Sequence, residues 1–315
     1  MNPRMNQRRL LTGLIAILLA AGPVGAQSGT QAGVPGNQAQ RIDWNARAPW
    51  AGRPDDVAPE GQQIAGFRIF DNLYYVGLKR VSAYLLTTTA GLVLIDTGFP
   101  ETTDFVLNNI RAVGFDPANI KYILITHSHA DHYGSAARIQ QLSRARVGMS
   151  LEDWQVVERS QSGPQTGPDR GLLLHRDLIL KDGESLRVGD ALLKFYVTPG
   201  HTPGATSIEF EAQDRGKSYR TLMPGGLGMQ FGREWSTTFI QSMERLKQLG
   251  PWDVLLGNHP FLMPRNLFDI QNDLGKRGQG PHPGVLGAAA TSAWLDRVLQ
   301  TAREKLASEQ PRSQP

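Results

Sequence analysis

The chain has 315 residues, 40% of them apolar, which is enough to bury the core of one large domain or two small ones. Beyond residue 30 no run of about 18 apolar residues occurs, so the sequence predicts no membrane-spanning helix there. The chain contains no cysteine. This excludes disulfides and thiolate metal ligands and leaves histidine and carboxylate side chains to bind any metal.

Residues 1–26 have the pattern of an export signal. Arg4, Arg8 and Arg9 precede an apolar stretch at 10–21. Val24-Gly25-Ala26 follows it as a small-x-small cleavage site. The apolar stretch is too short to serve as a membrane anchor. We therefore expect a signal peptide and a periplasmic or secreted protein, exported by the general secretory route or, through Arg8-Arg9, by the twin-arginine route.

The charge of the remaining chain is close to neutral. Residues 1–26 hold three arginines and no acidic residue, so their removal lowers the formal net charge from +4 to +1. A near-neutral protein without blocks of Lys or Arg gives no electrostatic reason to expect a nucleic-acid partner. We expect residues 27–60, rich in Gly, Gln, Pro and Ala, to form a flexible arm. Residues 61–308 would then form one domain, with a polar tail at 309–315.

The first half of the domain begins with β-rich segments and continues with alternating helices and strands. Segments 67–70 and 73–76 flank Asp71-Asn72, a turn signal, and predict a hairpin. Apolar patterning then predicts strands at 81–87 and 92–96, a helix at 101–113, a strand at 121–126, a helix at 131–142 and a Gly/Pro/Ser loop at 161–171. Between the last two, Ser150 is expected to cap a further helix, with Asp153 in a capping-box-like position.

The second half repeats this plan. The patterns predict strands at 192–198, 206–211 and 219–223, a helix at 238–249, a strand at 254–256 and a helix at 285–306. Interspersed strands and helices favour helices on the outer faces of sheets. Each half also has a strand that ends in a histidine loop, which is consistent with two related halves that meet at one site.

Three of the seven histidines fall within six residues, in His127-Ser128-His129-Ala130-Asp131-His132. In extended backbone, residues i and i+2 point to the same side, so His127 and His129 can reach one ion. Asp131 and His132, at the start of the following helix, can turn toward a second ion. Neutral imidazoles and a carboxylate suit zinc and leave positions open for water, as catalytic sites do.

Two later histidines can supply the third ligand of each ion. His201 lies among Pro and Gly residues that fix a tight turn after a strand, and His259 also follows a short strand. We therefore expect two zinc ions, one bound by His127, His129 and His201 and one by Asp131, His132 and His259. The isolated His175 and His282 are interpreted as ordinary surface or hydrogen-bonded residues.

Together with Asp96-Thr97-Gly98 upstream and Pro199-Gly200-His201-Thr202 downstream, these motifs resemble those of the metallo-β-lactamase superfamily. The resemblance covers most of the chain from Phe67 onwards. It implies an α/β fold, a single-domain four-layer αββα sandwich with the metals at one edge of its two sheets. It also implies that Asp96 is mainly a structural hydrogen-bonding residue.

Within the superfamily, the sequence is most similar to the class B lactamase subclass whose second zinc is bound by Asp-His-His. Many non-lactamase members carry an Asp that bridges the metals at the end of a later strand, but the corresponding residues 222–226 include none. Lactamases of this subclass usually hold the substrate carboxylate with Ser hydroxyls, which are missing from residues 223–229. The Gly225-Gly226 backbone, as an anion-binding nest, or Arg233 are candidates to replace them.

We therefore expect a metallo-β-lactamase, an enzyme of antibiotic resistance with a small-molecule substrate. A zinc-bound hydroxide, oriented by Asp131 as catalytic residue, would open the β-lactam ring of a penicillin, cephalosporin or carbapenem. Because the superfamily fold supports several activities, two alternatives stay open. One is a related zinc hydrolase of lactones or other esters, and the other is a non-catalytic zinc-binding protein on the same fold.

Overall fold

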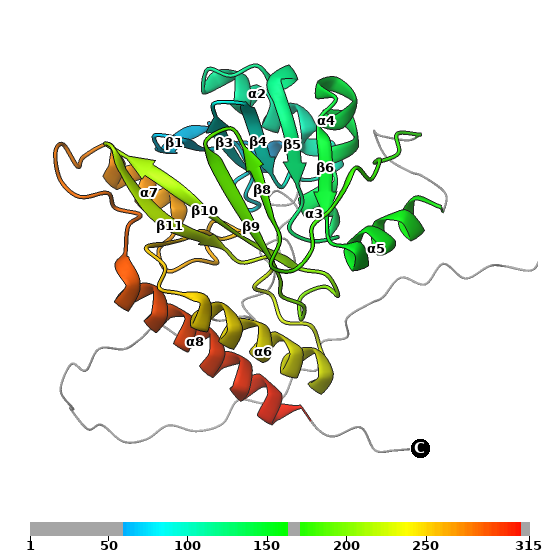
Figure 1. Cartoon of the computed structure of the whole chain (residues 1–315), viewed down its shortest axis with the longest axis vertical. Helices are drawn as coiled ribbons and strands as arrows, with labels where there is room; N and C mark the ends of the chain where they lie inside the picture. Colours follow the sequence, from blue (N-terminus) through cyan, green and yellow to red (C-terminus); the bar gives the residue numbers. More distant parts are fainter. Residues whose placement is uncertain (1–58, 163–170, 310–315) are drawn as a thin grey trace, which may run out of the picture. The chain divides into compact units, whose positions relative to one another are not determined.

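The computed structural model describes residues 59–162 and 171–309. The expected signal peptide lies outside the described residues, as do all but the last two residues of the arm and all but the first of the tail. The described residues form two β-sheets that pack face to face (Figure 1). No described helix is long and apolar enough to cross a membrane.

The first sheet has seven strands in the order in which they occur along the chain. The strands are β1 (Phe67–Phe70), β2 (Leu73–Tyr75), β3 (Tyr84–Thr88), β4 (Gly91–Ile95), β5 (Ile120–Leu124), β6 (Arg146–Met149) and β7 (Leu178–Ile179). Strands β1 to β4 pair antiparallel, and β4 to β7 pair parallel. The predicted hairpin around Asp71-Asn72 is therefore present as β1 and β2.

The second sheet has five strands in the order β12-β11-β10-β9-β8. They are β8 (Ser185–Val188), β9 (Ala191–Val197), β10 (Thr206–Asp214), β11 (Lys217–Met223) and β12 (Val254–Leu255). All pairs are antiparallel except β11 with β12, which is parallel.

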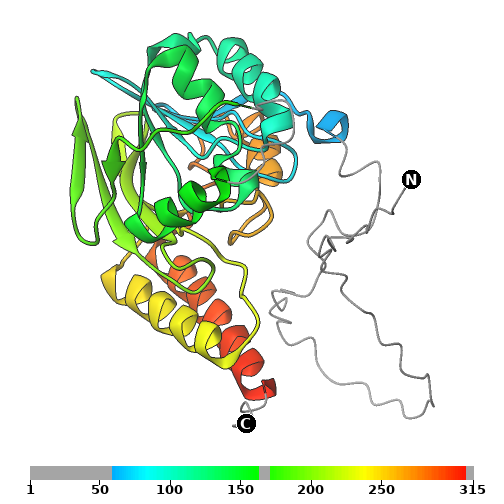
Figure 2. The ribbon, with the colours of Figure 1, turned by 90° about the vertical axis from the view of Figure 1, so that its right-hand side faces the viewer.

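Helices cover the outer face of each sheet (Figure 2). The α-helices are α2 (Thr103–Ala112), α3 (Ala130–Tyr133), α4 (Ala136–Ser143), α5 (Leu151–Gln161), α6 (Arg233–Leu249), α7 (Leu267–Leu274) and α8 (Gly287–Ser308), and the short 3-10 helices are η1 (Pro59–Gln62), η2 (Pro100–Thr102) and η3 (Pro117–Asn119). Helices α2, α4 and α5 bury apolar side chains against the first sheet, and α6 and α8 do so against the second.

Three apolar clusters define the four layers. The central one lies between the sheets and includes Leu86 and Val93 from the first and Phe210 from the second. Leu85 and Leu94, one position along the same strands, join the cluster under α2, α4 and α5. Because successive side chains of a strand point to opposite faces, strands buried on both faces are continuously apolar. The predicted αββα sandwich is confirmed.

One predicted helix is wrong. The segment 131–142 is not continuous but divides into α3 and α4 at Gly134 and Ser135. The Ser135 N–H donates to the carbonyl of Gly98 (3.2 Å) and its hydroxyl to that of Phe99 (2.7 Å). A Cβ on Gly134 would lie 2.3 Å from a ring atom of Pro100. This close contact with the loop after β4 pulls the backbone out of the helix.

Candidate metal centre

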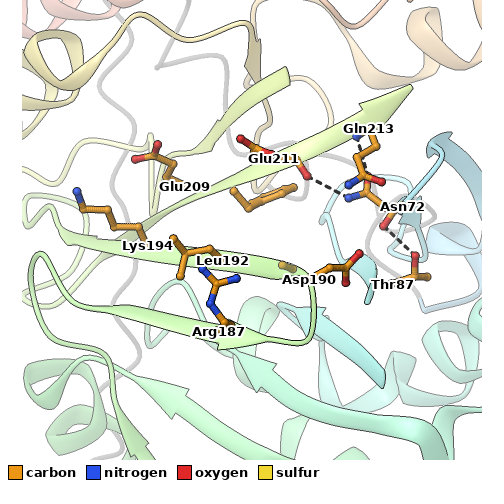
Figure 3. A pocket seen from close by; sticks show the side chains of 11 residues that line it. Asn72, Thr87, Arg187, Asp190, Leu192, Lys194, Glu209, Glu211 and Gln213 are labelled. Carbon is orange, nitrogen blue, oxygen red and sulfur yellow. Dashed lines mark hydrogen bonds between the residues drawn. The ribbon is translucent and has the colours of Figure 1, made fainter. Parts of the chain in front are cut away.

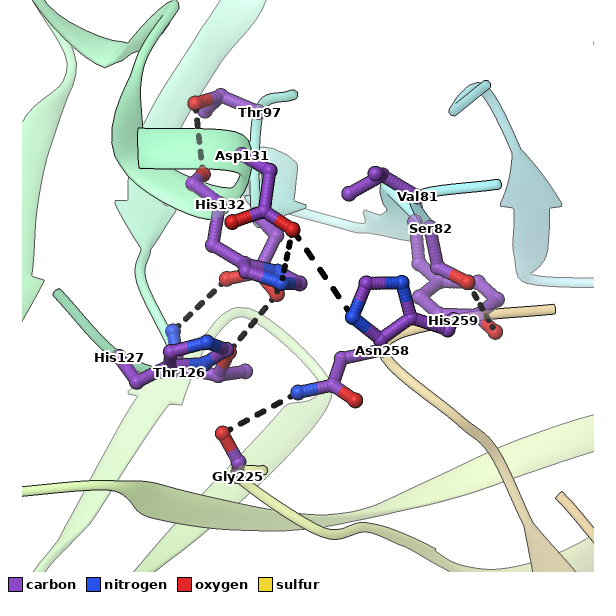
Figure 4. A network of polar contacts seen from close by, with 12 residues as sticks. Val81, Ser82, Thr97, Thr126, His127, Asp131, His132, Gly225, Asn258 and His259 are labelled. Atoms are coloured by element: carbon purple, nitrogen blue, oxygen red, sulfur yellow. Dashed lines mark hydrogen bonds and ion pairs between the residues drawn. The ribbon is translucent and has the colours of Figure 1, made fainter. Parts of the chain in front are cut away.

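The predicted ligands lie beyond the ends of three strands, in loops except for Asp131 and His132, which lie in the short helix α3. His127, His129, Asp131 and His132 follow β5 in the first sheet, whereas His201 follows β9 and His259 follows β12 in the second. Parts of the chain more than 130 residues apart therefore meet at one edge of the sandwich (Figure 4). The structure places all six side chains in two groups of three, in the predicted combinations.

The first trio consists of His127, His129 and His201, each of which offers a ring nitrogen within 4.8 Å of the others. The Nε2 atoms of His127 and His201 lie 3.1 Å apart. His127 is fully buried, while the other two are partly accessible.

The second trio consists of Asp131, His132 and His259, with ligand atoms again within 4.8 Å of one another. The Oδ2 atom of Asp131 lies 3.2 Å from Nε2 of His132 and 3.9 Å from Nε2 of His259 (Figure 4).

Neighbouring acceptors determine which ring nitrogen carries the proton in four of these histidines. On the side of the first sheet, the buried Asp96 accepts from Nδ1 of His132 (2.9 Å) and from the hydroxyl of Thr126 (2.8 Å). Because this hydroxyl donates its proton to Asp96, its oxygen can accept a hydrogen bond from Nδ1 of His127, which lies 3.0 Å away. Asp96 also accepts from the Thr126 N–H and enters neither trio, as a structural hydrogen-bonding residue should.

On the side of the second sheet, backbone carbonyls have the same effect. Nδ1 of His201 donates to the carbonyl of Gly228 (2.5 Å), and Nδ1 of His259 donates to that of Arg80 (2.8 Å). Each such hydrogen bond leaves Nε2 unprotonated and fixes the orientation of the ring, which is how metal-binding histidines are usually held.

The residues fit metal ions on two observations. In the first trio, the unprotonated Nε2 atoms of His127 and His201 face each other at 3.1 Å, where two lone pairs repel unless a cation accepts them. In the second, Nε2 of His132 is buried, makes no hydrogen bond and faces the carboxylate of Asp131. A cation at each position would satisfy these atoms, and the mixture of imidazole and carboxylate suits zinc.

The electrostatics of the two trios differ. Burial lowers the pKa of His127 well below its usual value, that of His201 to about 3 and that of His259 to about 4, so these rings are neutral ligands at pH 7. Burial also opposes the charging of His132, but Asp131 and Asp96 outweigh it and raise its pKa to about 10. Two carboxylates around one buried ring thus require a positive charge in the second trio.

The two glycines after β11, Gly225 and Gly226, leave no space for side chains of their own. A Cβ on Gly226 would lie 2.4 Å from the His201 ring, and one on Gly225 would lie 2.4 Å from the backbone of Thr206. The amide of Asn258, next to His259, donates to the Gly225 carbonyl (3.2 Å) and ties the loops after β11 and β12 together. An Asp at residue 225 or 226 would therefore overlap the Thr206 backbone or the His201 ring.

Two sequence-based candidates for substrate binding are wrong. The Gly225 N–H donates to the hydroxyl of Ser207 (3.0 Å) and is not free to form an anion-binding nest. The guanidinium of Arg233 donates to the carbonyls of Leu306 and Glu309, so it caps the end of α8.

The two isolated histidines agree with their sequence interpretation. His282 is buried, donates from Nε2 to the Ile69 carbonyl (2.7 Å), accepts from the Gly284 N–H (3.0 Å) and stacks on Phe70. His175 is exposed. A groove over β8, β9 and β10, lined by charged residues of both signs such as Lys194 and Glu209, contains no member of either trio (Figure 3).

Sequence reasoning missed the role of Asp153. The residue was noted only as part of a helix cap, and Ser150 does accept a hydrogen bond from its N–H (3.3 Å). Its carboxylate, however, bonds to residues beside the first trio. The serine-x-x-aspartate spacing could indicate the cap but not the long-range contacts.

The comparisons with known proteins place this fold, with its two candidate metal-binding trios, in a superfamily of hydrolases. The family model for the metallo-beta-lactamase superfamily matches residues 76–215. Of solved structures, the Rm3 metallo-beta-lactamase is 30% identical, with a TM-score of 0.63, and the alignment covers 79% of this chain and 94% of that one. BJP-1, a subclass B3 metallo-beta-lactamase of Bradyrhizobium japonicum, is 26% identical with a TM-score of 0.65, over 80% and 97% of the two chains. The chain belongs to the metallo-β-lactamase superfamily.

Curated relatives are more varied. The beta-lactamase-like protein 2 homolog of Caenorhabditis elegans is 26% identical over 59% of this chain and 58% of its own length. The N-acyl homoserine lactonase of Bacillus thuringiensis is 25% identical over 45% of this chain and 62% of its own length. The chain thus spans about three fifths of the length of these relatives.

Proposed function

We propose that this protein is an exported dizinc β-lactamase that opens the ring of penicillins, cephalosporins or carbapenems. The observation that carries the proposal is the pair of complete trios beside a strand end, residues 222–226, that carries no Asp to bridge them. Similarity to solved subclass B3 lactamases supports the same assignment.

Zinc is the metal that the ligands favour. The first trio offers three imidazoles and the second two imidazoles and a carboxylate, and three protein ligands leave the fourth position of a tetrahedral ion for water or substrate. When bound, two such ions would supply Lewis-acid activation of water and of the carbonyl group under attack.

The side chains of the protein have three tasks in this proposal. Asp96 and the carbonyls of Gly228 and Arg80 orient the histidine rings. The buried surroundings exclude bulk water from the inner ligands. The Asp131 carboxylate, whose pKa lies well below its usual range because His132 outweighs the opposing effect of burial, is ionised and accepts a hydrogen bond from the attacking water.

An apolar pocket that includes Arg80, a neighbour of His259, is a candidate site for part of a small organic substrate. Val81, Phe99 and Thr102 line it together with Arg80, whose carbonyl orients His259. A pocket of this kind suits the apolar substituents of a drug-sized molecule.

Lactone hydrolysis is the second candidate. The similarity to N-acyl homoserine lactonases favours it, although that similarity covers less than half of the chain. The lack of an Asp at residues 222–226 to bridge the metals favours the lactamase over this candidate.

Hydrolysis assays on the purified chain test both functions. We expect turnover of a chromogenic cephalosporin and a carbapenem that is lost with a chelator and restored by zinc, and that falls at least about 100-fold in His259→Ala. Zinc-loaded protein that opens acyl-homoserine lactones but neither drug would support the second candidate. Zinc binding at two equivalents without turnover of any ester or amide would support a non-catalytic role.

Export is part of the proposal and has its own test. Expression of the full chain in a Gram-negative host should yield periplasmic protein whose mass corresponds to cleavage after Ala26. Full-length protein retained in the cytoplasm would contradict it.

A further inference from the structure

Asp153 is a buried carboxylate close to the metal centre that belongs to neither trio. It lies in the first turn of α5 and is fully buried. Its Oδ2 atom accepts from the Ser128 N–H (2.9 Å) and from the Thr202 hydroxyl (2.7 Å), and Oδ1 accepts from the Gly204 N–H (2.9 Å). Three donors thus satisfy both oxygens, which compensates for burying the carboxylate.

The donors lie beside the ligands of the first trio. Ser128 stands between His127 and His129, and Thr202 follows His201. These two ligand loops come from different sheets, and Asp153 is hydrogen-bonded to both. The second trio has other supports, because Asp96 holds His132 and the Arg80 carbonyl holds His259.

The packing around Asp153 leaves little freedom. A Cβ on Gly204 would lie 2.0 Å from the hydroxyl oxygen of Ser150 and 2.9 Å from the nitrogen of Asp153. The loop that carries His201 therefore lies directly against the beginning of α5. Its position is fixed by this contact and by the carboxylate, whose charge is favourable at a helix N-terminus.

We propose that Asp153 is a positioning residue that holds His127, His129 and His201 at the spacing required by a metal ion and thereby sets the zinc affinity of the first trio. The inference rests on the zinc centre of the proposed function but not on the substrate. A carboxylate is required because asparagine has one acceptor oxygen. Its NH₂ group would face the N–H of Ser128 or Gly204, donor against donor.

The test is metal titration of the chelator-treated full chain and of its Asp153→Asn variant. Zinc affinity is measured by competition with a chromogenic chelator. We expect the affinity of one site to fall by about 10–100-fold and that of the other to stay at its wild-type value. The visible spectrum with one equivalent of Co²⁺ identifies the site. It should match that of His201→Ala and differ from that of His259→Ala.

Two further variants complete the design. Asp177→Asn is the matched control, because Asp177 also accepts a hydrogen bond from a backbone N–H (Val147, 2.8 Å) but contacts neither ligand loop. This variant should bind both ions with wild-type affinity. Thr202→Val removes one donor and leaves the carboxylate, and it should weaken the same site by a smaller factor. If Asp153→Asn does not fold, Thr202→Val decides by the same criteria.

Unchanged affinities would overturn the inference, and so would equal losses at both sites, which would indicate a role in the fold as a whole. The result of this metal titration does not depend on which substrate the protein hydrolyses. Zinc binding without β-lactam turnover would contradict the lactamase assignment alone, whereas an unselective Asp153→Asn result with normal turnover would contradict the role of Asp153 alone.

Discussion

At the residue scale, two glycines determine the position of the ligand His201. Gly226 packs against the ring of His201, and Gly228, whose carbonyl orients that ring, lies on the same loop. A side chain at either position would occupy the space of the ligand. The absence of a side chain is therefore a specific requirement of the site.

Gly226→Ala should displace His201. The added Cβ would lie 2.4 Å from Cδ2 of the ring, and relieving this overlap should cost about 1–3 kcal/mol of unfolding free energy. We also expect zinc stoichiometry to fall from two to one. Urea unfolding and metal analysis check this. Gly275→Ala, where the nearest atom is an ordinary 3.6 Å away, is the control, and a Gly226→Ala variant as stable and as zinc-rich as that control would contradict the prediction.

The six ligand candidates could be predicted from the sequence because their spacing is a local property of three short loops. The roles of Arg233 and Asp153 could not. Arg233 binds the end of α8, more than 70 residues away, and Asp153 contacts loops 25 and 49 residues from it. What such side chains contact depends on which elements the fold places next to them.

At the element scale, a cluster of polar side chains joins β9, β10 and β11 to the segment between α6 and β12. The Arg220 guanidinium pairs with Glu209 (2.6 Å), donates to the carbonyl of Leu249 and lies 4.1 Å from the centre of the Trp252 ring. The hydroxyl of Tyr196 donates to the same Glu209 (2.5 Å). The cluster lies on the outer face of the second sheet, where Glu209 also borders the groove of Figure 3.

This cluster predicts a pH dependence of stability. Burial opposes ionisation of Glu209, but its hydrogen bonds with Arg220 and Tyr196 outweigh it and lower its pKa. A lowered pKa in the folded state contributes stability above the ordinary Glu value, and that contribution is lost as the pH falls through the folded value. We expect Glu209→Gln to cost about 0.5–1 kcal/mol at pH 7 and less at pH 3.5.

Denaturant melts of chelator-treated protein at both pH values measure the difference without interference from metal binding. The control is Glu211→Gln, two residues along the same face of β10, where the described residues provide no ion pair. A cost for Glu209→Gln that does not change with pH would contradict the assignment of the effect to charge.

The elements themselves were predicted unevenly. Apolar strands such as β4 and β9 and the amphipathic helices α2 and α8 stand out in the sequence, whereas β6, β7 and β8, of four, two and four residues, were not predicted. These short strands are defined by pairing with their neighbours. Helix α7 was also missed, although Asn266 caps it by accepting from the Phe268 N–H (2.9 Å).

At the scale of the whole domain, each trio takes two ligands from the first sheet and one from the second. A bound ion in either trio would therefore connect the two sheets. The stability of the domain should depend on zinc, because a ligand that binds only the folded state stabilises it by mass action.

Removal of zinc should lower the melting temperature markedly. Free zinc at about a thousand times its dissociation constant contributes about 4 kcal/mol for each site, and one site alone corresponds to about 8–16 °C for a domain of this size. Calorimetry of the zinc-loaded and chelated protein measures the shift. Zinc should restore the higher melting temperature and magnesium should not. Equal melting temperatures with and without zinc would contradict the prediction.

The positions of the ligands along the chain determine which trio can be completed first as the chain emerges from its N-terminus. A chain that has emerged only as far as β9 contains His127, His129, Asp131 and His132 but no third ligand for either ion. His201 completes the first trio, and the second has to wait for His259, after β12 has joined the edge of its sheet. In the proposed export by the general secretory route, which threads the chain N-terminus first, the first trio would thus be complete before the carboxylate-containing one.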